Sequence, residues 1–96
     1  MTRMHNPPHP GEVLREYLAS FSIADVAAHI GVSHVALQRI VDGAESVSAD
    51  MAYRLGDALG TSPEFWAGMQ LDYDLYHASL VQRPKIERLS PAAKVA

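Results

Sequence analysis

The sequence predicts an all-α fold of five short helices, and three observations support this expectation. Apolar residues recur at three- and four-residue steps through most of the chain, which is the period of an amphipathic helix. A capping residue or a proline stands at the start of each periodic segment. Two of the segments, 23–30 and 33–41, are joined only by Gly31 and Val32, which is the arrangement of a tight helix–turn–helix.

The composition fits one globular domain. Of the 96 residues, 48% are hydrophobic and 20% are charged, which allows a modest core and argues against wholesale disorder. The chain has no cysteine, so a disulfide framework and a thiolate metal site are excluded. No apolar run approaches the roughly 20 residues of a membrane span, and the N-terminus lacks the apolar core of a secretory signal. We therefore expect a cytoplasmic protein.

The first helix is expected to begin in the segment His9 to Glu12. Proline suits the first turn of a helix, and an acidic residue complements the positive end of the helix dipole. Residues 1–8, which end in two prolines, are expected to form a flexible lead. The apolar stripe expected to face the bundle consists of Val13, Leu14, Tyr17, Leu18 and Phe21.

Serines predict the starts of the next three helices. Ser22, Ser33 and Ser48 each precede an apolar-periodic segment, and serine is a preferred N-cap. Asp42-Gly43 and Gly60 predict where the third and fourth helices end. The residues expected to face the core are Val26, Ala27, Ile30, Leu37, Ile40, Met51, Ala52, Leu55 and Leu59.

Ser62 and Pro63 predict a fifth helix, which carries more aromatic surface than four short helices can cover. Two interpretations remain open for this surface. It closes the base of the bundle, which Phe65 suits best, or it forms an interface with another copy, which suits Tyr73 and Tyr76.

From Ser79 onward the helical pattern fades, and Pro84 and Pro91 interrupt it. We therefore expect a folded domain over residues 9–79. Residues 80–96 are expected to form an extended C-terminal tail that orders on a partner.

The outer face of the third helix suggests DNA binding. With Leu37 and Ile40 turned inward, arginine and glutamine lie on the opposite face, where they can bond base edges in a major groove. The alternative is a helical hairpin in some other small bundle. This face carries Ser33, His34, Gln38 and Arg39, with Val35 and Ala36 between them.

No catalytic or metal-binding pattern competes with this interpretation. The five histidines include no i, i+4 pair with a third ligand, which a zinc site would need. Asp72 and Asp74 lie on different helical faces, and there is no Ser/His/Asp set or Gly-rich phosphate loop. We expect neither an enzyme nor a bound metal or cofactor.

Four segments together resemble the HigA (VapI-like) antitoxins of the phage-repressor-like XRE group. They are residues 9–14 (HPGEVL), 31–33 (GVS), 49–55 (ADMAYRL) and 60–66 (GTSPEFW). The resemblance covers about residues 9–78. It implies a five-helix, repressor-like helix–turn–helix domain that forms a homodimer through its C-terminal part. It further implies that the protein neutralises a partner mRNA-endonuclease toxin. Such proteins also repress the operon that encodes both, by binding palindromic double-stranded DNA.

The resemblance also implies roles for particular residues. It places DNA reading on Ser33, His34, Val35, Gln38 and Arg39, with Ser46 and Ser48 near the DNA backbone. We expect the dimer interface to include Phe65, Trp66, Met69, Tyr73 and Tyr76. Arg39 is the best candidate for a bidentate contact with guanine.

Two departures from the family pattern bear on DNA affinity. Ile23 stands where relatives often have a glutamine that reaches the backbone, and the loop 43–46 has an acid and no cation. The formal charge is −3, although phosphate neutralisation dominates DNA affinity. Two alternatives therefore stay open: a stand-alone regulator without a toxin, and a protein-interaction module with weak or lost DNA binding.

Overall fold

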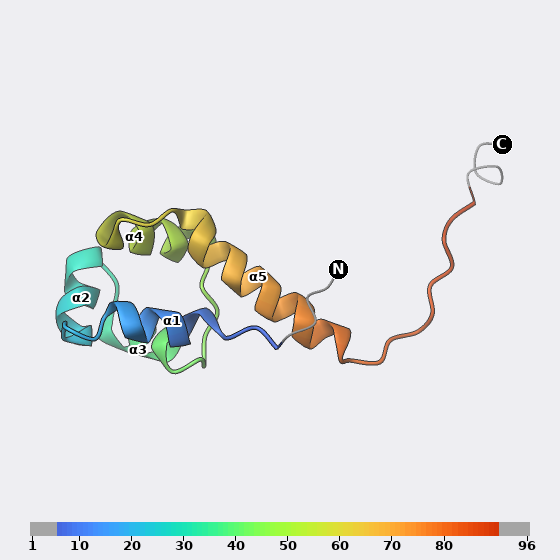
Figure 1. The fold of residues 1–96 in the computed structure, drawn as a ribbon, viewed down its shortest axis with the longest axis horizontal. Helices are drawn as coiled ribbons and strands as arrows, with labels where there is room; N and C mark the ends of the chain where they lie inside the picture. Colours follow the sequence, from blue (N-terminus) through green and yellow to red (C-terminus); the bar gives the residue numbers. More distant parts are fainter. Residues whose placement is uncertain (1–5, 91–96) are drawn as a thin grey trace.

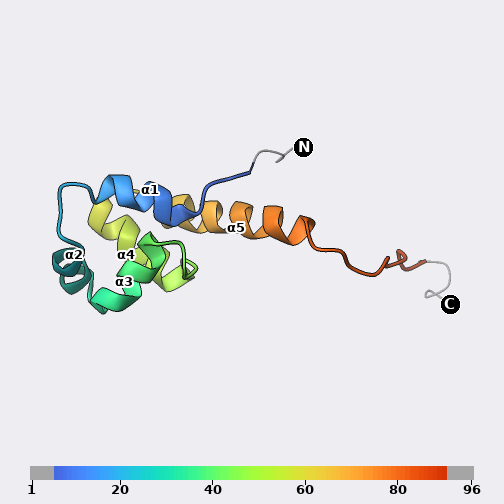
Figure 2. The same cartoon turned by 90° about the horizontal axis from the view of Figure 1, so that it is seen from below.

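Five α-helices make up the structure, a computed structural model that describes residues 6–90. They are α1 (Pro10–Tyr17), α2 (Ile23–Ile30), α3 (His34–Val41), α4 (Ala49–Leu59) and α5 (Pro63–Ser79). The described residues contain no strand, so the predicted all-α class is confirmed. The first four helices form a compact body, and α5 runs out from it toward an extended C-terminal segment (Figures 1 and 2). The molecule is correspondingly elongated, measuring 59 × 26 × 23 Å.

Serine side chains start four of the five helices, as the sequence predicts. Each hydroxyl accepts a hydrogen bond from the backbone N–H three residues later, at 3.0 to 3.2 Å. The four capping residues are Ser22, Ser33, Ser48 and Ser62. The first helix is capped instead by His9, whose Nδ1 accepts from the Gly11 N–H at 2.9 Å. Local hydrogen bonding thus accounts for where the helices begin.

The core lies between the helices of the body and is closed by one aromatic side chain of α5. Trp66 is fully buried, and its Nε1 donates to Thr61 Oγ1 at 2.7 Å. Most of the predicted inward residues are buried, while Leu59 is only partly so. The buried apolar residues are Leu14, Leu18, Val26, Ala27, Ile30, Leu37, Ile40, Val41, Val47, Met51, Ala52, Leu55 and Trp66.

The predicted stripe of the first helix is wrong at Phe21, which is 58% exposed. The reason is that α1 ends at Tyr17, so the helical period that would turn Phe21 toward the bundle no longer applies. Tyr17 is 41% exposed but does face the bundle, because its ring packs edge-on to that of Trp66 with centroids 5.3 Å apart. Only Leu14 and Leu18 of the stripe are buried, and Val13 packs at the edge of the core.

The chain beyond α5 runs away from the helical body. Residues 82–90 have no regular secondary structure and are exposed, as expected for an extended tail. The division of the chain at residue 79 stays a prediction. Residues 1–5 of the expected lead and 91–96 of the expected tail lie outside the described residues. Over residues 6–90, no helix has the length and apolar character to cross a membrane.

The contact between α1 and the end of α3 is close enough to require glycine. A Cβ atom at Gly11 would overlap the backbone carbonyl oxygen of Ile40, whereas a Cβ at Gly68 of α5 would meet no atom within 4 Å. The backbones of α1 and α3 can therefore approach only because Gly11 has no side chain.

This contrast predicts opposite effects of the same substitution. Gly11→Ala should lower the free energy of unfolding by about 1–3 kcal/mol, because a packed backbone must shift. Gly68→Ala, the matched control, should raise it by about 0.5–1 kcal/mol through improved helix propensity. Urea unfolding followed by circular dichroism measures both. Equal effects of the two changes would contradict the close contact.

Candidate nucleic-acid interface

The turn between α2 and α3 sets the angle between the two helices. Gly31 takes the left-handed conformation (φ 80°) at the end of α2. The N–H of Val32 then donates to the Ala27 carbonyl at 2.9 Å. Arg54 of α4 donates to the Ile30 carbonyl at 2.6 Å, which satisfies a carbonyl that the helix end leaves unpaired.

Burial of one side of α3 leaves the opposite side exposed. Leu37 and Ile40 are 0% and 2% exposed. Ser33, His34, Val35 and Arg39 are exposed, and Gln38 is half-buried. These are the side chains predicted to read DNA, and they lie on one surface.

Two adjoining shallow depressions collect all seven predicted DNA-binding residues. One is lined by Ser33, Val35 and Arg39 together with Ser46 and Ser48. The other is lined by His34, Val35, Gln38 and Arg39. The loop before α4 thus lies beside the outer face of α3. The structure brings the predicted residues together, and their contact with DNA stays a prediction.

Acidic side chains contact the two long polar residues of this surface, Arg39 and Gln38. Arg39 Nε lies 3.2 Å from Glu45 Oε1, and its Nη2 donates to the Ala44 carbonyl at 3.5 Å. Gln38 Nε2 donates to Asp42 Oδ1 at 3.0 Å. The Arg39–Glu45 pair is about half exposed on both sides, so it adds little stability but does favour one arginine conformation.

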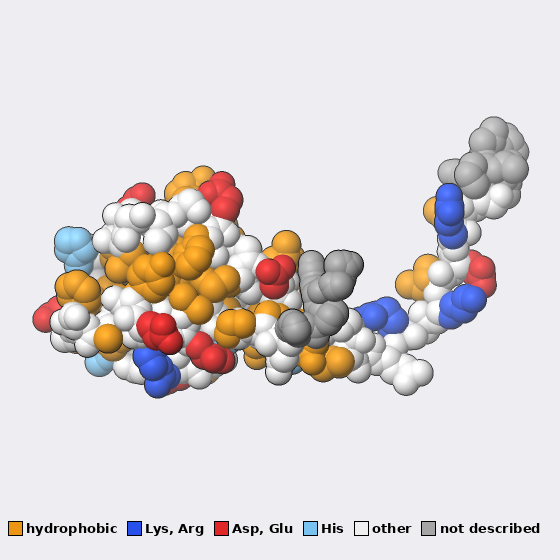
Figure 3. Space-filling view, viewed as in Figure 1, with side chains coloured by type: hydrophobic (Ala, Val, Ile, Leu, Met, Phe, Trp, Pro, Cys, Tyr) orange, Lys and Arg blue, Asp and Glu red, His pale blue; other side chains and the backbone are white. Residues whose placement is uncertain are grey.

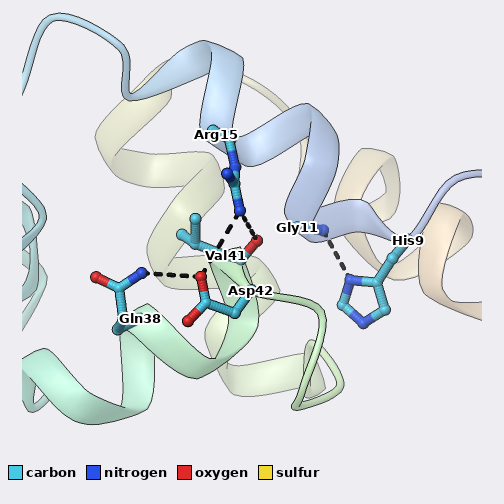
Figure 4. A network of polar contacts seen from close by, with 6 residues as sticks. All are labelled: His9, Gly11, Arg15, Gln38, Val41 and Asp42. Carbon is cyan, nitrogen blue, oxygen red and sulfur yellow. Dashed lines mark hydrogen bonds and ion pairs between the residues drawn. The ribbon is translucent and has the colours of Figure 1, made fainter.

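Arg15 joins α1 to the same end of α3 (Figure 4). Its Nη2 donates to the Val41 carbonyl at 3.1 Å and lies 3.6 Å from Asp42 Oδ1. Asp42 therefore contacts Gln38 and Arg15 at once through one carboxylate oxygen. Nothing in the local sequence marks this role of Arg15, because its partners lie 26 and 27 positions away in the chain.

Gln70 supports the loop from inside the protein. It is 6% exposed, and its Oε1 accepts from the Val47 N–H at 2.8 Å while its Nε2 donates to Asp74 at 2.9 Å. A buried N–H without a partner would be unfavourable, so this bond fixes the loop that carries Ser46. This role could have been inferred from the sequence, because Gln70 follows Trp66 by four residues and therefore lies on the same buried face of α5.

The residues predicted for a dimer interface do not share one exposed face. Trp66 is buried in the core, so its side chain has no surface to offer a partner. Phe65 is 38% exposed, and Met69, Tyr73 and Tyr76 are half-buried. Tyr73 packs edge-on to His9, with ring centroids 4.9 Å apart.

The most exposed apolar residues of α5 lie elsewhere on the helix. Leu71 and Leu75 are 57% and 48% exposed. With Gly68 and Ala78, which are also exposed, they recur at steps of three and four along one side. This side of α5 carries no aromatic residue, so the aromatic pattern of the sequence did not predict it.

The family model described as helix-turn-helix matches residues 13–66. The chain is 41% identical over 76 residues to "Virulence-associated protein A′" of Dichelobacter nodosus. That match covers 76% of this chain and 66% of that protein's length.

Two solved structures share both the fold and the sequence pattern. One is an addiction module antidote protein of the HigA family from Coxiella burnetii, with a TM-score of 0.73, 39% identity and coverage of 77% of this chain and 84% of that one. The other is the Pseudomonas aeruginosa antitoxin HigA with the higBA promoter, with a TM-score of 0.75, 42% identity and coverage of 77% and 84%. The chain belongs to the XRE-like helix-turn-helix family, in the group of HigA antitoxins.

Proposed function

We propose that this protein is an antitoxin and transcriptional repressor that binds the operator of its own operon as a dimer. In this proposal it also neutralises a partner mRNA-endonuclease toxin. The observation that carries the proposal is the single exposed surface formed by α3 and the loop 42–48. The fold is also similar to that of an antitoxin solved with promoter DNA.

In a major groove, the outer face of α3 offers three kinds of contact. Arg39 suits a bidentate bond to guanine, and Gln38 suits adenine. The exposed Val35 suits the methyl group of thymine. Ser33, Ser46 and Ser48, which line one depression, are placed to bond phosphates and so to orient the protein without reading sequence.

Arg39 must break its ion pair with Glu45 before its guanidinium can bond a base. An exposed ion pair is worth up to about 1 kcal/mol, whereas a correct bidentate base contact is worth about 1–3 kcal/mol of discrimination. The exchange is therefore favourable on the right base and unfavourable on the wrong one. Glu45 also repels phosphate, so it lowers affinity for DNA of any sequence.

A dimer would bring two such helices to the same side of DNA. The stripe of Gly68, Leu71, Leu75 and Ala78 is our candidate for its centre, because burying exposed leucines is favourable. By the helical period, Phe65, Met69, Tyr73 and Tyr76 lie on another side of α5, away from this centre. Two copies would present α3 about one turn of DNA apart.

A protein-interaction module remains the second candidate. It is favoured by the ion pairs of Arg15, Arg39 and Arg54 with neighbouring acids, which leave the helical body poorly suited to phosphate. The discriminating measurement is fluorescence anisotropy with DNA from the protein's own upstream region and with a scrambled duplex. A preference for the upstream duplex supports the repressor, and its absence at low salt supports the module.

Arg39 and Glu45 should affect DNA binding in opposite directions. Arg39→Ala should reduce the preference for the upstream duplex by about 1–3 kcal/mol. Glu45→Gln should strengthen binding to both duplexes, because it removes a charge that competes for Arg39 and repels phosphate. The double variant measures the coupling between the two residues. If Arg39→Ala weakened binding equally on both duplexes, its assigned role would be only a phosphate contact.

Leu71 and Leu75 should determine the oligomeric state. Replacing both by glutamate should convert the dimer to monomer, because four carboxylates would meet in the interface. Sedimentation velocity measures the change. Leu89→Glu is the matched control: Leu89 is 80% exposed in the tail, so this change should leave the dimer intact. A dimer that survives the double substitution would exclude this stripe as its centre.

A further inference from the structure

The chain separates its charges between the helical body, here taken together with α5, and the tail. Residues 6–79 contain three arginines and ten acidic residues, a formal charge of −7. Residues 80–96 contain four of the chain's eight cations and only one acid, Glu87. The four cations are Arg83, Lys85, Arg88 and Lys94.

The cations of the body are all engaged with acids. Each of its three arginines has a carboxylate oxygen within 3.6 Å of a side-chain nitrogen. The pairs are Arg15–Asp42, Arg39–Glu45 and Arg54–Asp50. Binding a phosphate with any of them would therefore require breaking an existing ion pair.

The cations of the tail are much more accessible. Lys85 and Glu87 are 84% and 85% exposed and only 4.0 Å apart at their closest. Arg83 donates to the Ala78 carbonyl at the end of α5. Within residues 6–90, Arg88 forms no ion pair. Figure 3 shows cationic groups following one another along the tail, whereas acidic groups are scattered over the body.

We propose that residues 82–90 form an arm that binds the phosphate backbone of duplex DNA next to the site read by α3. This proposal rests on the proposed function and adds a second DNA-binding element. Bound cations release the counterions condensed on DNA, which is the main source of sequence-independent affinity. The arm would supply this contribution, which the acidic body cannot.

The form of the tail suits a DNA backbone. Nine extended residues span roughly 30 Å, close to the roughly 34 Å of one turn of DNA. Ile86 and Leu89 are each 80% exposed, and proteins that bind the minor groove frequently insert apolar side chains between base steps. An acidic protein surface is the competing partner, but DNA carries a denser line of charge, about one per 1.7 Å of axis.

The test compares the full-length protein with the triple variant R83Q/K85Q/R88Q on the upstream and scrambled duplexes. Anisotropy titrations at salt concentrations from about 50 to 200 mM give the slope of log affinity against log salt. Each lost phosphate contact should reduce the slope by roughly 0.9. Because a dimer carries two arms of three cations each, the triple variant should lose roughly 5 in slope and at least about tenfold in affinity at the low end of that range, equally on both duplexes.

Two controls make the outcome specific. Glu87→Gln removes the acid of the tail and should strengthen binding to both duplexes. R83K/R88K keeps both charges and should retain the wild-type slope. Circular dichroism should be the same for all variants, because the tail contributes nothing to the buried core.

Different results of this experiment would overturn the DNA-binding arm and the proposed repressor function. An unchanged slope and affinity in the triple variant overturn the arm, even when the upstream duplex is preferred. Equal wild-type affinity for the two duplexes overturns the repressor, even when the slope depends on the tail. A wild-type protein that binds neither duplex at about 50 mM salt overturns both, and the tail would then be assigned to an acidic protein partner.

Discussion

The burial of Leu37 and Ile40 is the constraint on which the surface predicted to read DNA depends. These two side chains fix the rotation of α3 about its own axis, because their positions leave only one side of the helix for the core. Gly31 fixes the entry to α3, and the close approach at Gly11 holds its far end. With both ends held, the orientation of the exposed side of α3 is set by the core rather than by the residues on that side.

Local chemistry made much of this fold predictable from sequence. The four serine caps, the glycine ends and the inward faces of α2, α3 and α4 all follow from residues within one or two turns of each other. The positions of α3 predicted to read DNA could be proposed for the same reason, since the inward residues of one short helix dictate its outward ones. Ser46 and Ser48, which lie in the loop before α4, were implied only by the family resemblance.

What the sequence could not predict depends on contacts between distant segments. The bond from Gln70 to Val47 joins residues 23 positions apart, and Arg15 reaches residues beyond position 40. The exposure of Phe21 depends on where α1 stops, and that of Leu71 depends on how far α5 extends past the body (Figure 1). Periodicity identifies which residues share a face, but not which face finds a partner.

The distribution of charge gives the acidic body a use in recognition. Phosphate contacts raise affinity for every sequence alike, whereas base contacts raise it for only one. In the proposed function, a body whose arginines are paired with acids would bind random DNA weakly, and Arg39 would leave Glu45 only where a base bonds it better. Because a repressor must find its site among a vast excess of other DNA, the ratio of specific to non-specific affinity matters more than affinity itself. Keeping accessible cations out of the body would therefore lower the affinity of the recognition surface for random DNA, whereas the proposed arm would raise affinity for every sequence alike and leave the ratio unchanged.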